Sequence, residues 1–178
     1  LGVGIGGLAG MGAMLHLVNH SLAKGMLFLL AGNVLAVYRT KSAPQVRGLL
    51  QTLPVTGPLW LAGFLAISGS PPFGLFVSEL VILKGALQQG HTAVAVGYLL
   101  LLGIAFAAMA RIVLRMAYGS PADIAVEPER SRGAWAVVPP LALGVVVLAL
   151  GLCLPDWLHS ALTAAAAAAG VRGWPAGA

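Results

Sequence analysis

The 178-residue chain is 59% hydrophobic and only 8% charged, and its mean hydropathy is +0.94. Soluble globular proteins are about a quarter charged, so this composition excludes an ordinary soluble domain and indicates an integral membrane protein. The formal net charge of +5 would suit a nucleic-acid partner only if the cations shared one soluble face. They are instead scattered along the chain, as membrane topology requires, so we expect a lipid bilayer around the protein and no nucleic acid.

The chain begins with the glycine-rich stretch LGVGIGGLAGMG. Gly2, Gly4 and Gly7 have the spacing of a dinucleotide-binding fingerprint, but no preceding strand and no acidic residue about 20 positions later accompany them. We expect instead that glycines such as Gly6 and Gly10 let membrane helices approach closely. The stretch has no initiator methionine and no recognisable signal peptide. It is typical of a helix that is already under way, so we expect the chain to be a fragment.

Four apolar segments are long enough to cross a membrane, whose hydrocarbon core of about 30 Å requires roughly 20 apolar helical residues. They cover residues 12–37, 53–88, 93–117 and 134–154. The sequence therefore predicts about four transmembrane helices, in a membrane domain over residues 1–154.

The first predicted span contains LHLVNHSLAKG, which places His16, His20 and Lys24 four residues apart each time. At about 100° per residue, this spacing puts the three side chains on one slanted stripe of a helix. A single histidine here would be expected to be a hydrogen-bonded packing residue. Histidine titrates near neutral pH. Burial lowers the pKa of a lysine and raises the pKa of a glutamate, so both can also approach neutral pH. A regular row of such groups therefore indicates proton transfer.

The second predicted span is interrupted by ISGSPPFG. Pro71 and Pro72 lack amide hydrogens and clash with a preceding helical turn, while Gly69 and Gly74 allow an unwound backbone. We expect the helix to break at Ser70-Pro71-Pro72, near the middle of the membrane. Discontinuous helices mark ion or substrate sites in transporters, because freed carbonyl groups are tolerated there only inside protein or beside a wet cavity. The alternative is a re-entrant bend or a simple loop between two short helices.

Two ionisable residues follow the break, in LFVSELVILKGAL. An ionisable group at the centre of a spanning helix costs roughly 2.5 to 3.5 kcal/mol, so Glu79 requires a partner or a function. Lys84 lies nearer the end of the span, where we expect it to extend to the membrane surface.

The single cysteine, Cys153, lies in the apolar run LALGLCLP and cannot form an internal disulfide. We expect it to be a packing residue. No CxxC or HExxH spacing offers a metal site, and the chain has no cysteine cluster, haem motif or nucleotide-binding loop. We therefore expect no metal and no cofactor in this chain.

The basic residues gather in and beside two of the connecting loops. Loop 38–51 has no acidic residue, and loop 118–133 follows two arginines at the end of the third span; the basic residues are Arg39, Lys41, Arg47, Arg111, Arg115, Arg130 and Arg132. The connection QQGHT has no formal charge. The positive-inside rule places the two basic loops in the cytoplasm and QQGHT outside, and an even alternation of four spans gives the same topology.

The alanine-rich residues 155–178 follow the last span. Alanine favours helix, whereas the glycines and proline near the end stop it. We expect a short external helix in this tail.

Two of these motifs resemble one family of membrane proteins. HLVNHSLAKGMLFLLAGNV resembles the helix with histidines before a lysine in the antiporter-like subunits of respiratory complex I, multisubunit cation/proton antiporters and membrane-bound hydrogenases. LAISGSPPFGLFVSELVIL is similar to the family's broken helix, in which a lysine or glutamate follows the break. The glutamate version is most similar to hydrogenase-4 component F and formate hydrogenlyase-type subunits, and also to the complex I member that uses glutamate. The resemblance covers residues 1–118 well and the last span weakly.

The resemblance implies a fold of about fourteen helices with two inverted repeats, of which this chain supplies roughly the last four. It implies that His16, His20, Lys24 and Glu79 carry protons through the second repeat. Because the first repeat lies outside this chain, we do not expect the chain to pump alone.

The leading functional hypothesis is the C-terminal part of a proton-translocating subunit of a redox-driven complex in the cell inner (plasma) membrane. The chain would be a non-redox subunit of an oxidoreductase, and partner membrane and peripheral subunits would hold Fe-S, Ni-Fe or flavin centres. Two alternatives stay open. One is a subunit of a multisubunit Na+/H+ antiporter without redox chemistry, and the other is a passive anchor whose polar residues only pair helices.

Overall fold

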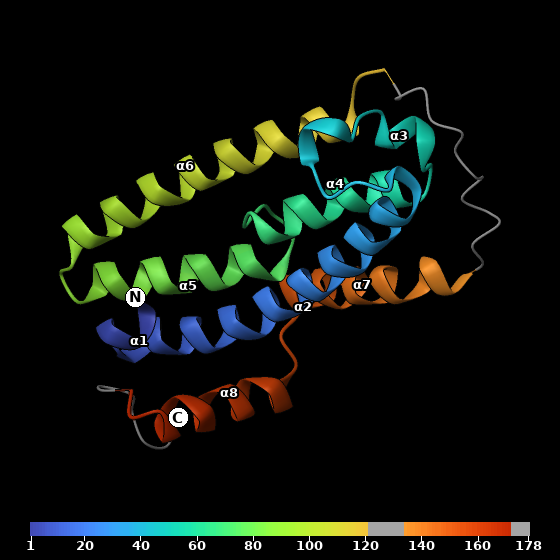
Figure 1. Cartoon of the computed structure of the whole chain (residues 1–178). Helices are drawn as coiled ribbons and strands as arrows, with labels where there is room; N and C mark the ends of the chain where they lie inside the picture. Colours follow the sequence, from blue (N-terminus) through green and yellow to red (C-terminus); the bar gives the residue numbers. More distant parts are fainter. Residues whose placement is uncertain (121–133, 172–178) are drawn as a thin grey trace.

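The computed structural model describes residues 1–120 and 134–171, and every regular element in these two ranges is helical (Figure 1). In chain order the elements are α1 (Gly2–Ile5), α2 (Gly7–Tyr38), η1 (Ala43–Gln45), α3 (Leu49–Thr52), α4 (Thr56–Ile67), α5 (Gly74–Gln88), α6 (Thr92–Ala117), η3 (Ala134–Ala136), α7 (Val138–Leu152) and α8 (Asp156–Ala168). The expectation of an all-α protein is confirmed for the described part of the chain. Arg130 and Arg132 of the second basic loop lie outside the described residues.

Two of the helices are long and apolar enough to cross a membrane by themselves. They are α2, with 32 residues, and α6, with 26 residues, and they correspond to the first and third predicted spans. The fourth predicted span differs from expectation, because α7 has only 15 residues and α8 leaves it at an angle of 85°. Counted as one bent pair, α7 and α8 make a third candidate span.

The second predicted span is two helices, as the prolines suggested. α4 ends at Ile67, and the chain then passes through residues 68–73 before α5 begins at Gly74. Their 12 and 15 residues correspond to lengths of about 18 and 22 Å, so neither crosses the hydrocarbon core alone. The broken pair brings the ends of two helices into the interior of the molecule, and this position defines the site described below.

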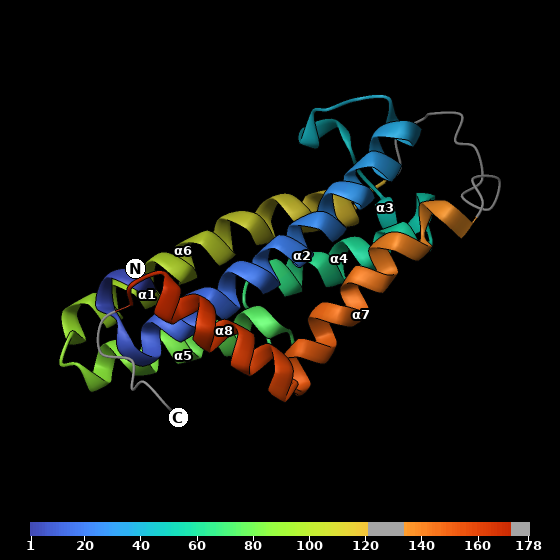
Figure 2. The ribbon, with the colours of Figure 1, turned by 90° about the horizontal axis from the view of Figure 1, so that it is seen from below.

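α2 runs through the middle of the molecule (Figures 1 and 2). It packs against α4, α5, α7 and α8, and α6 lies beyond α5. Its buried side recurs every three or four residues, at Leu15, Asn19, Ala23, Met26, Leu30, Val34 and Tyr38. This spacing is the helical period, so one stripe of α2 faces protein along its whole length. His16, His20 and Lys24 each follow a member of this stripe by one residue and lie along its edge.

Small residues let these helices approach closely. A side chain at Gly85 of α5 would meet the backbone of Ala9 in α2, and one at Gly12 would lie 2.9 Å from Cγ1 of Ile82. Gly10 faces Val171, which follows α8. The close approach at Gly10 is thus to a residue outside the helices, and the close helix contacts are made at Gly12 and Gly85 instead.

The helix predicted in the alanine-rich tail is present as α8. Asp156 lies in its first turn, where a carboxylate is favoured by the helix dipole. Leu158 and Leu162 are buried against Leu15 of α2. The tail therefore packs on the central helix in the structure.

Candidate functional site

His16 is held by a hydrogen-bond network that joins α2 to α5. Its Nδ1 lies 3.0 Å from Oγ of Ser78, and the Ser78 hydroxyl donates to the carbonyl oxygen of Leu75 at 2.7 Å. A serine hydroxyl has a single hydrogen, so Ser78 Oγ accepts the hydrogen of His16 Nδ1. The network therefore favours one tautomer and leaves Nε2 of His16 to exchange a proton with other groups.

The second histidine lies one turn further along the same helix. The rings of His16 and His20 are stacked, with centroids 5.5 Å apart and an angle of 27° between their planes. This arrangement follows from the spacing of four residues, which the sequence provides. The two imidazoles are therefore neighbours, and a proton has only a short distance to travel between them.

Both histidines line a cavity of about 210 Å³ together with Glu79 of α5. Tyr98 of α6 and Ser68, at the end of α4, also line it, and the remaining lining residues are apolar. The structure thus brings Glu79 together with His16 and His20, although 59 residues separate Glu79 from His20 in the sequence. The sequence predicted each of these residues, but only the packing of α2 against α5 places them around one space.

Glu79 also lines a second cavity of about 280 Å³, which is bounded by the broken segment at Gly69, Ser70 and Pro71. Glu79, Tyr98, Ser68 and Leu102 line both cavities. Glu79 therefore lies at the boundary between the two cavities.

The carboxylate of Glu79 lies directly against the broken segment. Gly69 has a φ of +67°, and a side chain at this position would overlap the Glu79 carboxylate. The left-handed backbone favours glycine here, and any added side chain would displace the Glu79 carboxylate. Gly69 therefore takes part in the break, as predicted, and also leaves room for the Glu79 carboxylate beside it.

The other side of the break is closed by α7. A side chain at Gly151 would overlap the carbonyl oxygen of Pro72 and lie 2.6 Å from the carbonyl carbon of Phe73. The backbone of α7 therefore covers this part of the unwound segment.

Asn19 is a buried polar residue that the sequence reasoning did not identify. Its side chain is 0% exposed, it donates from Nδ2 to the carbonyl oxygen of Leu15 at 3.1 Å, and it lies against Gly74 at the start of α5. Among the described residues its Oδ1 has no hydrogen-bond partner. A polar amide in an apolar helix, one residue before His20, was the available signal.

Ser78 and Tyr98 also escaped the sequence reasoning. Ser78 immediately precedes Glu79, so its position on α5 was a weak signal. Tyr98 gave none, because nothing in the sequence shows which side of α6 faces α5.

The two lysines differ from the histidines in their surroundings. Lys24 continues the stripe of α2 by one turn beyond His20, but its side chain is exposed and lines neither cavity. Lys84 on α5, which is also exposed, lies five residues beyond Glu79. The structure therefore brings together three of the four predicted proton-carrying residues and leaves Lys24 at the surface of this chain.

Comparison with known proteins assigns this arrangement to a family. The profile of the family described as "NADH:quinone oxidoreductase/Mrp antiporter, TM" matches residues 1–108, which include the stripe, the break and Glu79. The chain belongs to this family. It is thus a membrane protein with several transmembrane helices, of the antiporter-like type found in complex I, Mrp antiporters and hydrogenases, and the resemblance noted from the sequence is confirmed.

Individual relatives come from more than one branch of the family. The chain is 34% identical over 122 residues to a hydrogenase-4 component F homolog from Methylacidiphilum infernorum, covering 66% of this chain and 25% of the relative. It is 30% identical over 108 residues to a Na(+)/H(+) antiporter subunit from Bacillus subtilis, covering 61% of this chain and 22% of the relative. The chain therefore spans about a quarter of the length of these curated relatives.

The fold matches a solved structure over almost its whole length. A chain of an Mrp complex from Dietzia sp. superimposes with a TM-score of 0.78 and 25% identity, covering 97% of this chain and 40% of the matched chain. The helical arrangement, including α7 and α8, is therefore one that a solved antiporter-like protein also adopts.

Proposed function

We propose that this chain is the C-terminal part of a proton-translocating membrane subunit of a redox-driven complex, of the hydrogenase-4 or NADH-quinone oxidoreductase type. Protons would move along His16, His20, Lys24 and Glu79, while electron transfer takes place in partner subunits. One observation carries the proposal: Glu79, beside the break, shares a cavity with two stacked histidines from another helix.

The geometry supports a relay with Glu79 as the central station. His16 presents Nε2 away from its bond with Ser78, His20 is stacked on it, and the cavity connects both with the Glu79 carboxylate. The second cavity gives the Glu79 carboxylate another space with which it could exchange a proton. A pump must take up a proton from one space and release it into another. Moving one charge against 100 mV costs about 2.3 kcal/mol, so the complex must supply at least this much free energy for each proton.

Lys24 would be the next station on the α2 stripe. It lies four residues beyond His20, so the step between them resembles the step from His16 to His20. Its exposed side chain suits a group that exchanges with a neighbouring part of the complete protein.

Partner subunits would supply the redox chemistry and hold the Fe-S, Ni-Fe or flavin centres. The similarity to a hydrogenase-4 component F homolog supports this assignment. The membrane would be the cell inner membrane, with loops 38–51 and 118–133 facing the cytoplasm, as the basic residues favour.

The second candidate is a subunit of a multisubunit Na+/H+ antiporter. It is supported by the similarity to the Bacillus subtilis antiporter protein and by the match to an Mrp complex. In this case the same residues would exchange protons for sodium without electron transfer.

Inverted membrane vesicles that contain the complete protein would test the proposal. NADH, formate and hydrogen would be supplied in turn, and proton uptake and electron transfer would be recorded together in sodium-free buffer. We expect Glu79→Gln to lower the proton-to-electron ratio at least tenfold, because glutamine keeps the shape but cannot carry a proton. Lys84→Gln is the matched control and should keep a nearly normal ratio.

A normal ratio in Glu79→Gln would contradict the relay and favour the passive anchor. The antiporter assignment is correct if none of the three donors drives proton uptake, but NaCl releases protons from vesicles that carry an imposed pH gradient, acidic inside.

A further inference from the structure

A third concave site lies away from the two cavities at Glu79, where loop 38–51 meets the end of α6 (Figure 1). Its volume is about 200 Å³, and it is lined by Ala43, Pro44, Val46, Arg47, Ile112 and Arg115. Two of the six residues are arginines, and none is acidic. The arginines come from different elements, because Arg47 follows η1 and Arg115 lies in the last turn of α6.

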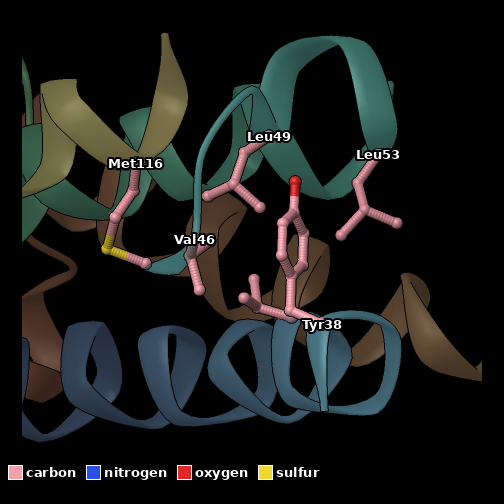
Figure 3. Close-up of a cluster of buried hydrophobic side chains, with 6 residues drawn as sticks. Tyr38, Val46, Leu49, Leu53 and Met116 are labelled. Atoms are coloured by element: carbon pink, nitrogen blue, oxygen red, sulfur yellow. The ribbon is translucent and has the colours of Figure 1, made fainter. Parts of the chain in front are cut away.

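The loop that carries Arg47 is fixed to the rest of the protein. The Tyr38 hydroxyl donates to the carbonyl oxygen of Arg47 at 2.6 Å, and the amide of Gly48 donates to the carbonyl oxygen of Tyr118 at 3.3 Å. Beneath the loop, a hydrophobic cluster joins α2, the loop, α3 and α6 (Figure 3); it contains Val34, Tyr38, Val46, Leu49, Leu53 and Met116. The backbone positions of Arg47 and Arg115 are therefore fixed relative to each other.

Among the residues that the structure describes, the charge around this site is positive. Arg39 and Lys41 precede η1, and Arg111 lies one turn before Arg115 on α6. The acidic residues of the described ranges are elsewhere, since Glu79 lines the central cavities and Asp156 begins α8. An arginine fork matches the oxygens of a phosphate group, so a concave site lined by two arginines favours a phosphate anion.

The surface next to the arginines is apolar and continues down α6. Leu101, Ile104, Ala108 and Ile112 follow one another by three or four residues, and Arg115 follows Ile112 by three, so the five residues share one face of the helix. The three large members are 68%, 65% and 52% exposed. We call Leu101, Ile104, Ala108 and Ile112 the α6 strip.

We propose that Arg47 and Arg115 bind the phosphate of an anionic phospholipid, with an acyl chain lying along the α6 strip. A free phosphate would use the two guanidinium groups but not the strip. A lipid uses both, because its headgroup lies at the end of a spanning helix and its chains run parallel to that helix. This site is independent of proton transfer at Glu79.

The test uses the complete protein, purified in detergent and stripped of lipid, with native mass spectrometry to measure bound lipid. Phosphatidylglycerol, phosphatidylcholine and inorganic phosphate are the three probes. We expect saturable binding of phosphatidylglycerol, which Arg47→Gln with Arg115→Gln weakens about 30-fold, because both guanidinium groups lose their charge-assisted hydrogen bonds to the phosphate. Lys41→Gln and Arg111→Gln, which remove cations outside the lining, should change binding less than threefold.

A second pair of variants separates loss of binding from loss of folding. Arg47→Lys with Arg115→Lys keeps both charges and should retain most of the binding. In the membrane, a photo-reactive amino acid at Ile112 should crosslink to lipid.

Four results would overturn the proposal. They are equal binding of phosphatidylcholine, binding of inorganic phosphate without binding of phosphatidylglycerol, unchanged binding in the double glutamine variant, and crosslinking of position 112 to another protein. The last result would assign this surface to a subunit interface.

Discussion

The two long helices, α2 and α6, are both apolar enough to cross a membrane, yet they have opposite surroundings. In the most apolar window of α2, 28% of the residues are buried inside the structure, whereas for α6 the share is 6%. α2 contains two histidines, a lysine and a buried asparagine, while the only ionisable side chains of α6 between its ends belong to Tyr98 and the arginines near its last turn. Polar groups are thus concentrated on the helix that protein surrounds, where each can have a partner.

The comparison predicts that added volume is tolerated at the open positions of α6 but not at the buried positions of α2. Gly12→Leu would force a side chain into Ile82 and Val81 of α5, where there is no space. Overpacking of this kind costs about 1 to 3 kcal/mol of stability, so we expect a severe loss in the amount of assembled protein in the membrane. Gly97→Leu on α6 is the matched control, because no atom lies within 4 Å of the added Cβ. Both variants can be followed by the yield and thermal stability of the complete protein; equal losses would show that α6 is as closely packed as α2.

The next largest effect concerns the two exposed lysines. We expect Lys24→Ala to lower proton translocation at least tenfold while assembly is kept, because it removes a station of the α2 stripe. Lys84→Ala should change translocation less than twofold, since Lys84 lies on α5 and is not part of the α2 stripe. Proton uptake at equal protein content measures both. Similar behaviour of the two variants would show that exposure, and not membership of the stripe, decides the role of a lysine here.

The smallest effects are expected at the partners of the relay. Ser78→Ala removes the acceptor of the His16 Nδ1 hydrogen, so His16 loses the bond that fixes its tautomer. We expect translocation to fall about two- to fivefold, because one hydrogen bond contributes roughly 0.5 to 1.5 kcal/mol. Tyr98→Phe, which keeps the ring on α6, should change it less. A larger effect of Tyr98→Phe than of Ser78→Ala would place a station of the relay on α6.

Much of this arrangement follows from local rules that a sequence reveals. The spacing of His16 and His20 places their rings side by side on an α-helix. α4 ends just before Gly69, whose φ of +67° is typical of the residue after a helix, and the two prolines that follow cannot resume the helix. The interactions between helices were beyond such rules. Burial of Asn19, the bond from His16 to Ser78 and the position of Tyr98 depend on how α2, α5 and α6 are rotated about their axes.

The last predicted span shows the same limit. The sequence of α7 and the following residues is apolar or alanine-rich, and this composition does not show that the chain turns by 85° between Leu152 and Asp156. Leu158 and Leu162 bury their side chains against α2, and this tertiary contact favours the turn.

The close approach of Gly151 to Pro72 has a consequence for leakage. An unwound segment offers polar backbone groups on all sides, and each side that water reaches is a route by which protons can return down their gradient. In the described chain the backbone of α7 closes one such side at Pro72 and Phe73, whereas the side at Gly69 and Ser70 opens on the cavity beside Glu79. If the chain translocates protons as proposed, a larger residue at position 151 would separate the two backbones and admit water between them, so the lack of a side chain at Gly151 would prevent leakage.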